Sequence, residues 1–484
     1  MDVSVAVYTL IIYKIILIFI GFWSQRRTRD TEDYFLGGRN LGPVVAAISY
    51  GASSASAWTL LGMSGVTYML GLPAIWIAAG AILGCAVAWI WIAPRLMQYT
   101  RARNQITLTE FLAENPEQAS TENSAQVAKI ASAIILLSFI FYIAAQFQGS
   151  ATTFASVFGL PLAESLIAGA AIITIYTFLG GFWAASITDT LQGGLMLIAA
   201  ILLPGTAFIY LGGWESIKGS GIFTDQSLTL TGENAGLAAA GFIAGNLAVG
   251  IGTLGQPHLL NRFMALRDQR ALKTAQVLAI GWISLMFLSM FALGLMGKVL
   301  LPDLVDPEAL FFELSSQLLP PFIGAILLAA VLSAIMSTAD SMLLVVAATI
   351  SNDLQFQRLL PGRELLLSRV SMVAVATLAV LVAMFLPATI FERVLFAWIA
   401  IGSAFAPTIL ARLSGIPIYP KDVTRSMITG FVLAVAFYLR PNTPGDWAER
   451  LVPFSAAMAV LLAPMLFQRF LSRLRTRTTS DPAR

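Results

Sequence analysis

Long apolar runs, separated by short polar or charged connections, occupy almost the whole of this sequence. About 20 consecutive apolar residues cross the hydrocarbon core of a bilayer, and most of these runs reach that length. We predict about thirteen spans, at residues 4–23, 42–70, 72–95, 125–156, 161–179, 184–213, 236–256, 271–300, 321–350, 366–386, 389–413, 424–440 and 450–470. The chain is therefore expected to be an all-α integral membrane protein without a soluble domain.

The composition excludes several classes of protein. Hydrophobic residues make up 57% of the chain and charged residues only 11%, whereas a soluble protein carries about 25% charged residues. Cys85 and His258 are the single cysteine and the single histidine. An intrachain disulfide and a cysteine-based metal site are therefore excluded, and catalytic triads and histidine-rich metal sites are disfavoured. A membrane enzyme would need such groups, so transport is the stronger interpretation and no enzymatic activity is expected.

The placement of charges supports the span count, because basic residues concentrate in cytoplasmic connections. With the N-terminus outside, the connections that fall inside carry most of the 29 basic residues, including Arg95, Arg262 and Arg412. The connection at 301–320 falls on the other side and carries acidic residues but no basic one. We therefore expect a multi-pass protein of the cell (inner) membrane, with its N-terminus outside and its C-terminus in the cytoplasm.

Two predicted spans are interrupted. The span 42–70 is long for one crossing and has a run of small and polar residues, 49–56, at its middle, and the span 236–256 carries six glycines. If the first span is peripheral, these two segments lead two sets of five spans. Interrupted segments at matching positions of two halves indicate an inverted-repeat transporter. The alternative is that the small residues only allow close helix packing.

Two carboxylates lie in apolar surroundings, where an ionised side chain costs several kcal/mol unless it is paired or solvated. Asp189 lies near the start of one predicted span and Asp340 lies deep in another. No lysine or arginine is close to either in the sequence, so we expect a cation from solution to be their partner. For Asp189, capping of a helix end near the cytoplasmic face is the alternative.

The residues around Asp340 place several oxygen atoms together. Positions 334, 337, 338 and 341 are three or four residues apart and so share one helix face. That face carries the hydroxyls of Ser337, Thr338 and Ser341 beside the Asp340 carboxylate. Because hard cations bind oxygen ligands, this pattern predicts a cation site. The alternative is that the hydroxyls bond to the backbone of their own helix.

Several motifs, in their order along the chain, resemble those of the solute:sodium symporter family, and most of all those of its sodium/proline symporters. They are Asp33–Arg39, Gly51–Trp58, Gly180–Asp189, Gly255–His258 with Arg262–Ala265, and Ser333–Ser341. The resemblance covers nearly the whole chain. It implies a single transmembrane domain, 1–484, with a five-plus-five inverted-repeat core of LeuT type at about 42–413 and peripheral helices at about 4–23, 424–440 and 450–470.

The resemblance also implies sodium (Na+) as the coupling ion, one or two per cycle. The first sodium site of the family corresponds to the carbonyls of Ala52, Ala55 and Ala334 and the hydroxyls of Ser337 and Thr338. A second site, present in some members, corresponds to Asp189, Ser337, Asp340 and Ser341. Asp340 stands where some relatives carry a serine, and its extra charge favours cation binding.

For the solute, the resemblance points to Ser56, Trp58, Gly62 and Tyr142. The sequence departs from the proline-transporter pattern at three places. Ser54 replaces a carboxylate, Val249 and Thr253 replace a tryptophan and a tyrosine, and Gln146 and Gln148 replace small or apolar residues. The loss of two aromatic groups is expected to enlarge and reshape the pocket, and Gln146 adds hydrogen-bonding capacity. We therefore add Ser54, Gln146 and Thr253 to the candidate solute residues.

We therefore expect a secondary active transporter that imports a small organic solute with sodium by alternating access, with proline or a related amino acid as the first candidate. Another solute such as an organic acid, or a proton-coupled or substrate-sensing relative of the same fold, is the alternative. An ion channel is disfavoured because no repeated filter segment is present. The expected partners are the solute and the lipid bilayer, with no nucleic acid and no obligatory protein partner.

Overall fold

The computed structural model describes residues 36–115, 121–177, 182–219, 229–350, 364–386, 388–440 and 443–479, together with parts of 7–20. The motif residues 33–35 and 178–181 lie outside these ranges. Apart from an isolated bridge between Leu41 and Leu266, the regular elements of the described residues are helical. They are η1 (Gly37–Arg39), α3 (Pro43–Ser54), η2 (Trp58–Gly62), α4 (Met63–Leu70), η3 (Leu72–Ala74), α5 (Ile75–Val87), η4 (Ala88–Ile92), α6 (Ala93–Ala102), α7 (Leu108–Ala113), α8 (Thr121–Phe158), α9 (Leu162–Thr177), α10 (Phe182–Tyr210), α11 (Trp214–Gly219), α12 (Gly236–Leu247), α13 (Val249–Thr253), α14 (Pro257–Ala265), α15 (Gln269–Leu300), η5 (Pro307–Ala309), α16 (Leu310–Leu318), α17 (Pro321–Ala348), α18 (Glu364–Phe385), α19 (Ile390–Leu413), α20 (Pro420–Tyr438), η8 (Pro444–Asp446) and α21 (Trp447–Thr479).

These helices confirm the membrane architecture expected from the sequence. Within the described ranges, eight helical stretches are long and apolar enough to cross a membrane, and a bent pair adds a ninth. Shorter apolar helices at Val7–Leu17, Leu162–Ile175 and Arg369–Phe385 coincide with three more predicted spans. Helix α20 coincides with another. The total of thirteen crossings stays a prediction.

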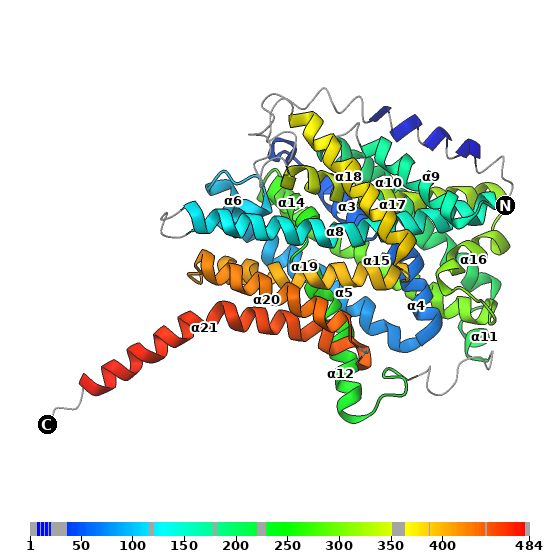
Figure 1. Cartoon of the computed structure of the whole chain (residues 1–484). Helices are drawn as coiled ribbons and strands as arrows, with labels where there is room; N and C mark the ends of the chain where they lie inside the picture. Colours follow the sequence, from blue (N-terminus) through cyan, green and yellow to red (C-terminus); the bar gives the residue numbers. More distant parts are fainter. Residues whose placement is uncertain are drawn as a thin grey trace.

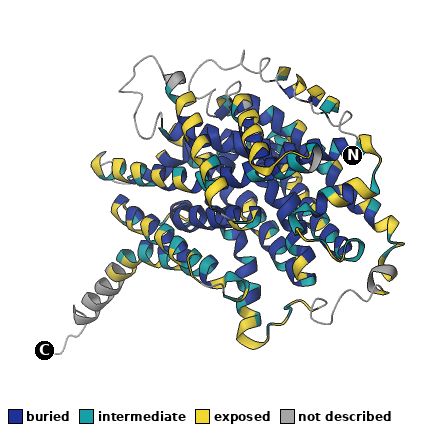
Figure 2. Ribbon diagram, turned by 45° about the vertical axis from the view of Figure 1, so that its right-hand side comes forward, coloured by how far each residue is buried: buried dark blue, intermediate teal, exposed yellow. Residues whose placement is uncertain are grey.

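Helices α17 and α19 form the centre of the bundle (Figure 1). In the apolar stretch of α17, 83% is buried inside the protein, and in that of α19, 94% is buried. The corresponding value for the span Pro444–Phe467 is 22%. Helix α17 packs against α3, α8 and α10. Figure 2 shows the same arrangement, with buried residues gathered in the middle and exposed residues on the outer faces. The first helix reaches this centre, since the Tyr13 and Ser333 hydroxyls are 2.6 Å apart.

The first interrupted span is broken in the structure. Its two parts, Pro43–Ser54 and Trp58–Leu70, meet at an angle of 60°. Ala55 leaves helical geometry (φ −86°, ψ 76°), and the chain continues through η2, a π-helical turn. The carbonyls just before the break therefore lose the amide partners that a continuous helix would supply.

The second interrupted span breaks near its end. Helices α12 and α13 continue to Thr253, and Gln256 is extended (ψ 111°) before Pro257 begins α14. Proline suits this first helical position because its missing N–H would have no intrahelical partner there. The interruption thus lies at Leu254–Gln256.

Glycines of this second segment also allow close helix packing. The segment is thus both interrupted and closely packed. A Cβ atom on Gly84 of α5 would lie 2.4 Å from the carbonyl oxygen of Gly250 in α13. A Cβ atom on Gly250 would lie 2.2 Å from the carbonyl oxygen of Gly80. Helices α5 and α13 therefore cross in backbone contact, as small residues permit inside membranes.

We expect Gly84→Ala to lower the thermal stability of the purified protein, because the added methyl group meets backbone that must shift. Overpacking of this kind costs about 1–3 kcal/mol. Gly281→Ala in α15 is the matched control, since its Cβ would meet nothing within 4 Å. Thermal unfolding in detergent checks both variants, and equal melting temperatures for the two would contradict the α5–α13 contact.

Candidate functional site

The broken end of α3 faces hydroxyl groups of α17. Ser337 Oγ donates to the Ala52 carbonyl (2.9 Å) and Thr338 Oγ1 donates to the Ser53 carbonyl (3.1 Å). The same two hydroxyl oxygens lie 3.2 and 3.1 Å from the Ala334 carbonyl oxygen. All five residues are fully buried. Helix α17 therefore supplies the hydrogen-bond donors that the break removes.

Oxygen atoms thus gather where the first sodium site is expected. Ala52, Ala334, Ser337 and Thr338 belong to this network, and Ala55 lies at the break itself. Carbonyl and hydroxyl oxygens are the ligands that hard cations bind. This set of oxygens therefore fits a sodium ion. To bind it, the two hydroxyls would rotate so that their hydrogen atoms point away from the ion.

A second polar cluster surrounds the carboxylate of Asp189 in α10. Its Oδ2 accepts hydrogen bonds from Ser49 Oγ (2.7 Å), Ser53 Oγ (3.2 Å) and Arg262 Nη2 (3.0 Å). Both charged side chains are buried, with 0% and 1% of their surfaces exposed. No basic residue is close to Asp189 in the sequence, but Arg262 is adjacent to it in the fold and pairs with it. That a cation from solution also binds here stays a prediction.

Arg262 extends from α14 to three other helices. Its Nη2 also donates to Ser53 Oγ (3.0 Å) and Ser341 Oγ (2.7 Å), and its Nε donates to Ser49 Oγ (3.2 Å). Its Nη1 bonds to the His258 carbonyl of its own helix. The charge count placed this arginine among the cytoplasmic connections. In the structure Arg262 lies in the connection between the spans Gly236–Thr253 and Gln269–Leu300. It also joins α14 to α3, α10 and α17.

Asp340 lies beside this cluster and is only 3% exposed. Its Oδ1 accepts a long hydrogen bond of 3.4 Å from Ser341 Oγ. Asp189 and Ser341 thus meet at the Arg262 guanidinium, while Ser337 belongs to the first network. Two carboxylates and one guanidinium leave a net charge of minus one when all three groups are ionised. In that ionisation state, one added monovalent cation would bring the net charge of the cluster to zero.

The candidate solute residues lie just beyond the break. Ser56 Oγ lies 3.2 Å from Tyr142 Oη of α8, and both residues are fully buried. Trp58 Nε1 donates to the Ser54 carbonyl at 3.4 Å. Side chains from α3, η2 and α8 therefore converge directly after the backbone that forms the first oxygen network.

Gln146 of α8 also contacts the break. Its Oε1 accepts a hydrogen bond from the Ala57 N–H (3.2 Å), which the helix break leaves without a carbonyl partner. Its Nε2 has no hydrogen-bond partner among the described residues, although Gln146 is fully buried. A buried donor without a partner is costly, so this amide is suited to donate to an acceptor on a bound solute.

Aromatic rings close one side of this region. The Trp58 ring centroid lies 5.8 Å from that of Phe391 and 6.5 Å from that of Trp398. The Tyr142 ring lies 6.1 Å from Trp398. Gly62 permits the approach, since a Cβ atom there would lie 3.3 Å from Phe391 Cβ. Phe391 and Trp398 both belong to α19 and were not predicted, because an aromatic residue in an apolar span carries no sequence signal of its own.

Trp398 fills space beside the glycine-rich segment. A Cβ atom on Gly252 would lie only 1.9 Å from Trp398 Cδ1, and Trp398 Nε1 donates to the Val249 carbonyl (3.1 Å). Thr253, the next residue after Gly252, is also buried. The small residues at 249 and 253 therefore do not simply enlarge the pocket, because an indole from α19 packs against this stretch.

Glu308 holds the end of α19 that carries Phe391. Its carboxylate accepts hydrogen bonds from the N–H groups of Ile390 (3.2 Å) and Phe391 (3.0 Å). Burial raises the pKa of Glu308, and these two backbone bonds act in the opposite direction. A carboxylate at a helix N-terminus also meets the positive end of the helix dipole. The contact adds to the capping box of Thr389 and Glu392 at the start of α19 and ties this end of the helix to η5.

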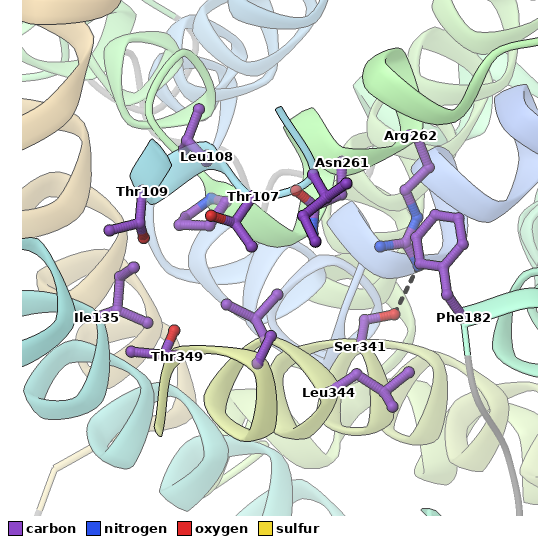
Figure 3. A pocket seen from close by; sticks show the side chains of 14 residues that line it. Thr107, Leu108, Thr109, Ile135, Phe182, Asn261, Arg262, Ser341, Leu344 and Thr349 are labelled. Atoms are coloured by element: carbon purple, nitrogen blue, oxygen red, sulfur yellow. Dashed lines mark hydrogen bonds between the residues drawn. The ribbon is translucent and has the colours of Figure 1, made fainter. Parts of the chain in front are cut away.

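A cavity reaches the second cluster from one end of the bundle (Figure 3). Its walls come from the segment before α7, from α14 and from the C-terminal half of α17, and they include Thr107, Asn261, Arg262 and Ser341. Figure 3 shows Phe182 beside Arg262. None of the seven candidate solute residues lines this cavity. It therefore leads to the cluster around Arg262 and not to the aromatic region.

Comparison with known proteins places the chain among transporters. A model of the sodium:solute symporter family matches residues 34–415. The sodium/proline symporter of Staphylococcus aureus (strain JH9) is 36% identical over 447 residues, which cover 88% of this chain and 84% of that protein. The sodium/proline symporter of strain COL matches with the same identity and coverage.

Solved structures of three transporters share the fold. A Na+-coupled sialic acid symporter, in a substrate-bound outward-open state, matches with a TM-score of 0.75 and 16% identity, over 95% of this chain and 98% of that one. Mhp1, a nucleobase-cation-symport-1 family transporter, matches with a TM-score of 0.55 and 14% identity, over 89% and 95%. MhsT in complex with L-phenylalanine gives 0.51 and 15%, over 87% and 98%.

These likenesses confirm the LeuT-type transporter fold that the family resemblance implies. The family match spans both oxygen clusters and the aromatic region. The chain belongs to the sodium:solute symporter family, a family of transporters.

Proposed function

We propose that the protein imports a small organic solute together with sodium ions by alternating access. The observation that carries the proposal is the break in α3, whose freed carbonyls face Ser337 and Thr338 of α17. The candidate solute residues begin directly after this break, at Ser56. Ion and solute would therefore bind to one short stretch of backbone, so that each stabilises the geometry that the other needs.

The first sodium ion would bind to Ala52, Ala55, Ala334, Ser337 and Thr338. In the structure the two hydroxyls bridge α17 to the α3 carbonyls. A sodium ion at this position would hold α3 against α17 and shape the solute site beyond the break. Separation of the two helices on inward opening would remove ligands and release the ion.

A second sodium ion would bind at the cluster of Asp189, Ser337, Asp340 and Ser341. Its support is the net charge of minus one that Asp189, Asp340 and Arg262 carry together when all three are ionised, and the cavity beside this cluster. Each sodium ion that enters the cell gains about 2.3 kcal/mol from a membrane potential of 100 mV. Two ions per cycle would therefore support steep accumulation of the solute.

Proline or a related amino acid is the first candidate solute. It is supported by the 36% identity to the sodium/proline symporters of Staphylococcus aureus. The departures at Ser54, Gln146 and Thr253, together with the Trp398 indole, favour a pocket of altered shape and polarity. A sodium-coupled importer of an organic acid, or a proton-coupled relative, is the second candidate, because Gln146 offers an unpaired donor to a carboxylate.

The protein would lie in the cell (inner) membrane with its N-terminus outside and its C-terminus in the cytoplasm, and a single chain would suffice for transport. The distribution of basic residues supports this orientation. The cavity opens beside residues 106–109, which follow the basic residues Arg101 and Arg103. In this orientation the cavity faces the cytoplasm and offers an exit for the second ion.

We expect the double variant Ser337→Ala, Thr338→Ala to lose at least about tenfold of its sodium-dependent uptake, because two ligands of the first ion are removed. Uptake of proline and related amino acids into proteoliposomes with a sodium gradient measures this loss. The matched control is Thr174→Ala, Thr177→Ala, whose hydroxyls bond to the backbone of their own helix, α9. Normal uptake by the first variant would overturn the proposed function.

We expect Asp189→Asn to weaken the sodium activation of uptake and also to destabilise the protein. Removing one partner of a buried ion pair costs about 3–5 kcal/mol, and the Arg262 guanidinium would remain buried. Asp268→Asn is the control, since its exposed pair with Arg267 has the same 3.0 Å distance and is worth about 0–1 kcal/mol. Unchanged sodium activation in Asp189→Asn would contradict the second site.

Thermal stabilisation of the purified protein by a panel of amino acids and organic acids, with and without sodium, identifies the solute. We expect proline or a related amino acid to raise the melting temperature only when sodium is present, because ion and solute share the break in α3. Stabilisation by a solute in the absence of sodium would contradict sodium coupling. Solute uptake that is stimulated by acidic pH without sodium would indicate proton coupling.

A further inference from the structure

The place of Arg262 within the second cluster carries an inference that rests on the proposed function. Its Nη2 lies 3.0 Å from Asp189 Oδ2, 3.0 Å from Ser53 Oγ and 2.7 Å from Ser341 Oγ. These three oxygens come from three helices, α10, α3 and α17, and converge on one nitrogen. A sodium ion bound to the same oxygens would occupy the position of that nitrogen, so ion and guanidinium exclude each other.

We propose that Arg262 is a tethered cation that takes the place of the second sodium ion during the transport cycle. An arriving sodium ion displaces the guanidinium from Asp189. When the ion leaves, the guanidinium returns, neutralises the carboxylate and prevents rebinding from the cytoplasmic side. The competition lowers the affinity for the second ion and favours its release.

The structure provides space for the displaced guanidinium. Arg262 and Ser341 lie in the wall of the cavity together with Phe182 and Asn261 (Figure 3). The guanidinium carbon lies 5.2 Å from the centroid of the Phe182 ring, whose face attracts a cation. Asn261 Oδ1 has no hydrogen-bond partner among the described residues and lies one position before Arg262 in α14. The guanidinium thus keeps an aromatic face beside it when it leaves Asp189, and Asn261 supplies an acceptor without a partner in the wall of the same cavity.

The charges of the cluster also favour an exchange. When all three groups are ionised, Asp189 and Asp340 carry two negative charges and Arg262 carries one positive charge. With one sodium ion on the Asp189 oxygens and the guanidinium still nearby, the charges of Asp189, Asp340, Arg262 and the ion sum to zero. Asp340 therefore allows the ion to enter without leaving a buried excess of positive charge, which would be costly in a membrane interior.

Binding of radioactive sodium to the full-length protein in detergent, together with stabilisation by sodium on heating, tests the proposal without relying on transport. Arg262→Gln removes the competing charge and should lower the sodium concentration for half-saturation by at least about fivefold, within the usual range of coupling between sites. Arg262→Lys keeps a charge but loses the planar fork, and should give an intermediate affinity. The control is Arg412→Gln, a buried arginine that contacts Leu112 and Glu114, and it should leave sodium affinity unchanged.

Unchanged or weakened sodium binding in Arg262→Gln would overturn the proposal. If that variant does not fold, Arg262→Lys decides, and a sodium affinity equal to or below that of the wild type would overturn it. Wild-type protein that neither binds sodium nor is stabilised by it would instead refute the proposed function. The two failures are therefore distinguishable.

Discussion

The structure depends on a break in a helix whose backbone is buried inside the protein, since Ala52, Ala55 and Ala57 are not exposed to solvent. In such surroundings each freed carbonyl or N–H group needs a partner within the protein. Ser337 and Thr338 of α17 donate to the carbonyls before the break, and Gln146 of α8 accepts from the N–H of Ala57 after it. The break can exist only because α17 and α8 lie on either side of it.

This requirement determines where small residues are needed. Gly149 of α8 lies against the break, since a Cβ atom there would be 2.9 Å from Ala57 Cβ. Gly149 follows Gln146 by three positions and so shares its helix face. The missing side chain lets α8 come close enough for the Gln146 amide to reach the backbone. The close packing of α8 at Gly149 and the hydrogen bond of Gln146 to the break therefore both follow from the position of this helix face.

The sequence was sufficient to predict features that depend on local pattern. Hydropathy indicates the spans, the polar run at 49–56 indicates the break, and helical spacing places Ser337 and Thr338 together. Contacts between helices distant in the sequence follow no such pattern. Arg262 resembles the other arginines near span ends, and only the fold shows that it turns inward to Asp189. The same holds for Trp398, whose indole packs on Gly252 from another helix.

The ion pair of Asp189 and Arg262 is poorly explained by stability alone. Removing two charges from water costs several kcal/mol per ion, and well-packed apolar residues often stabilise a core equally well. An arginine that only closed the gap between helices would not need donors aimed at three separate oxygens. The planar guanidinium holds several donors in a fixed fork, and here its Nη2 meets Ser53, Asp189 and Ser341 together. The same three oxygens could surround a cation, and a cavity lies beside them. The arrangement therefore supports the proposal that the pair is one of two states of a cation site.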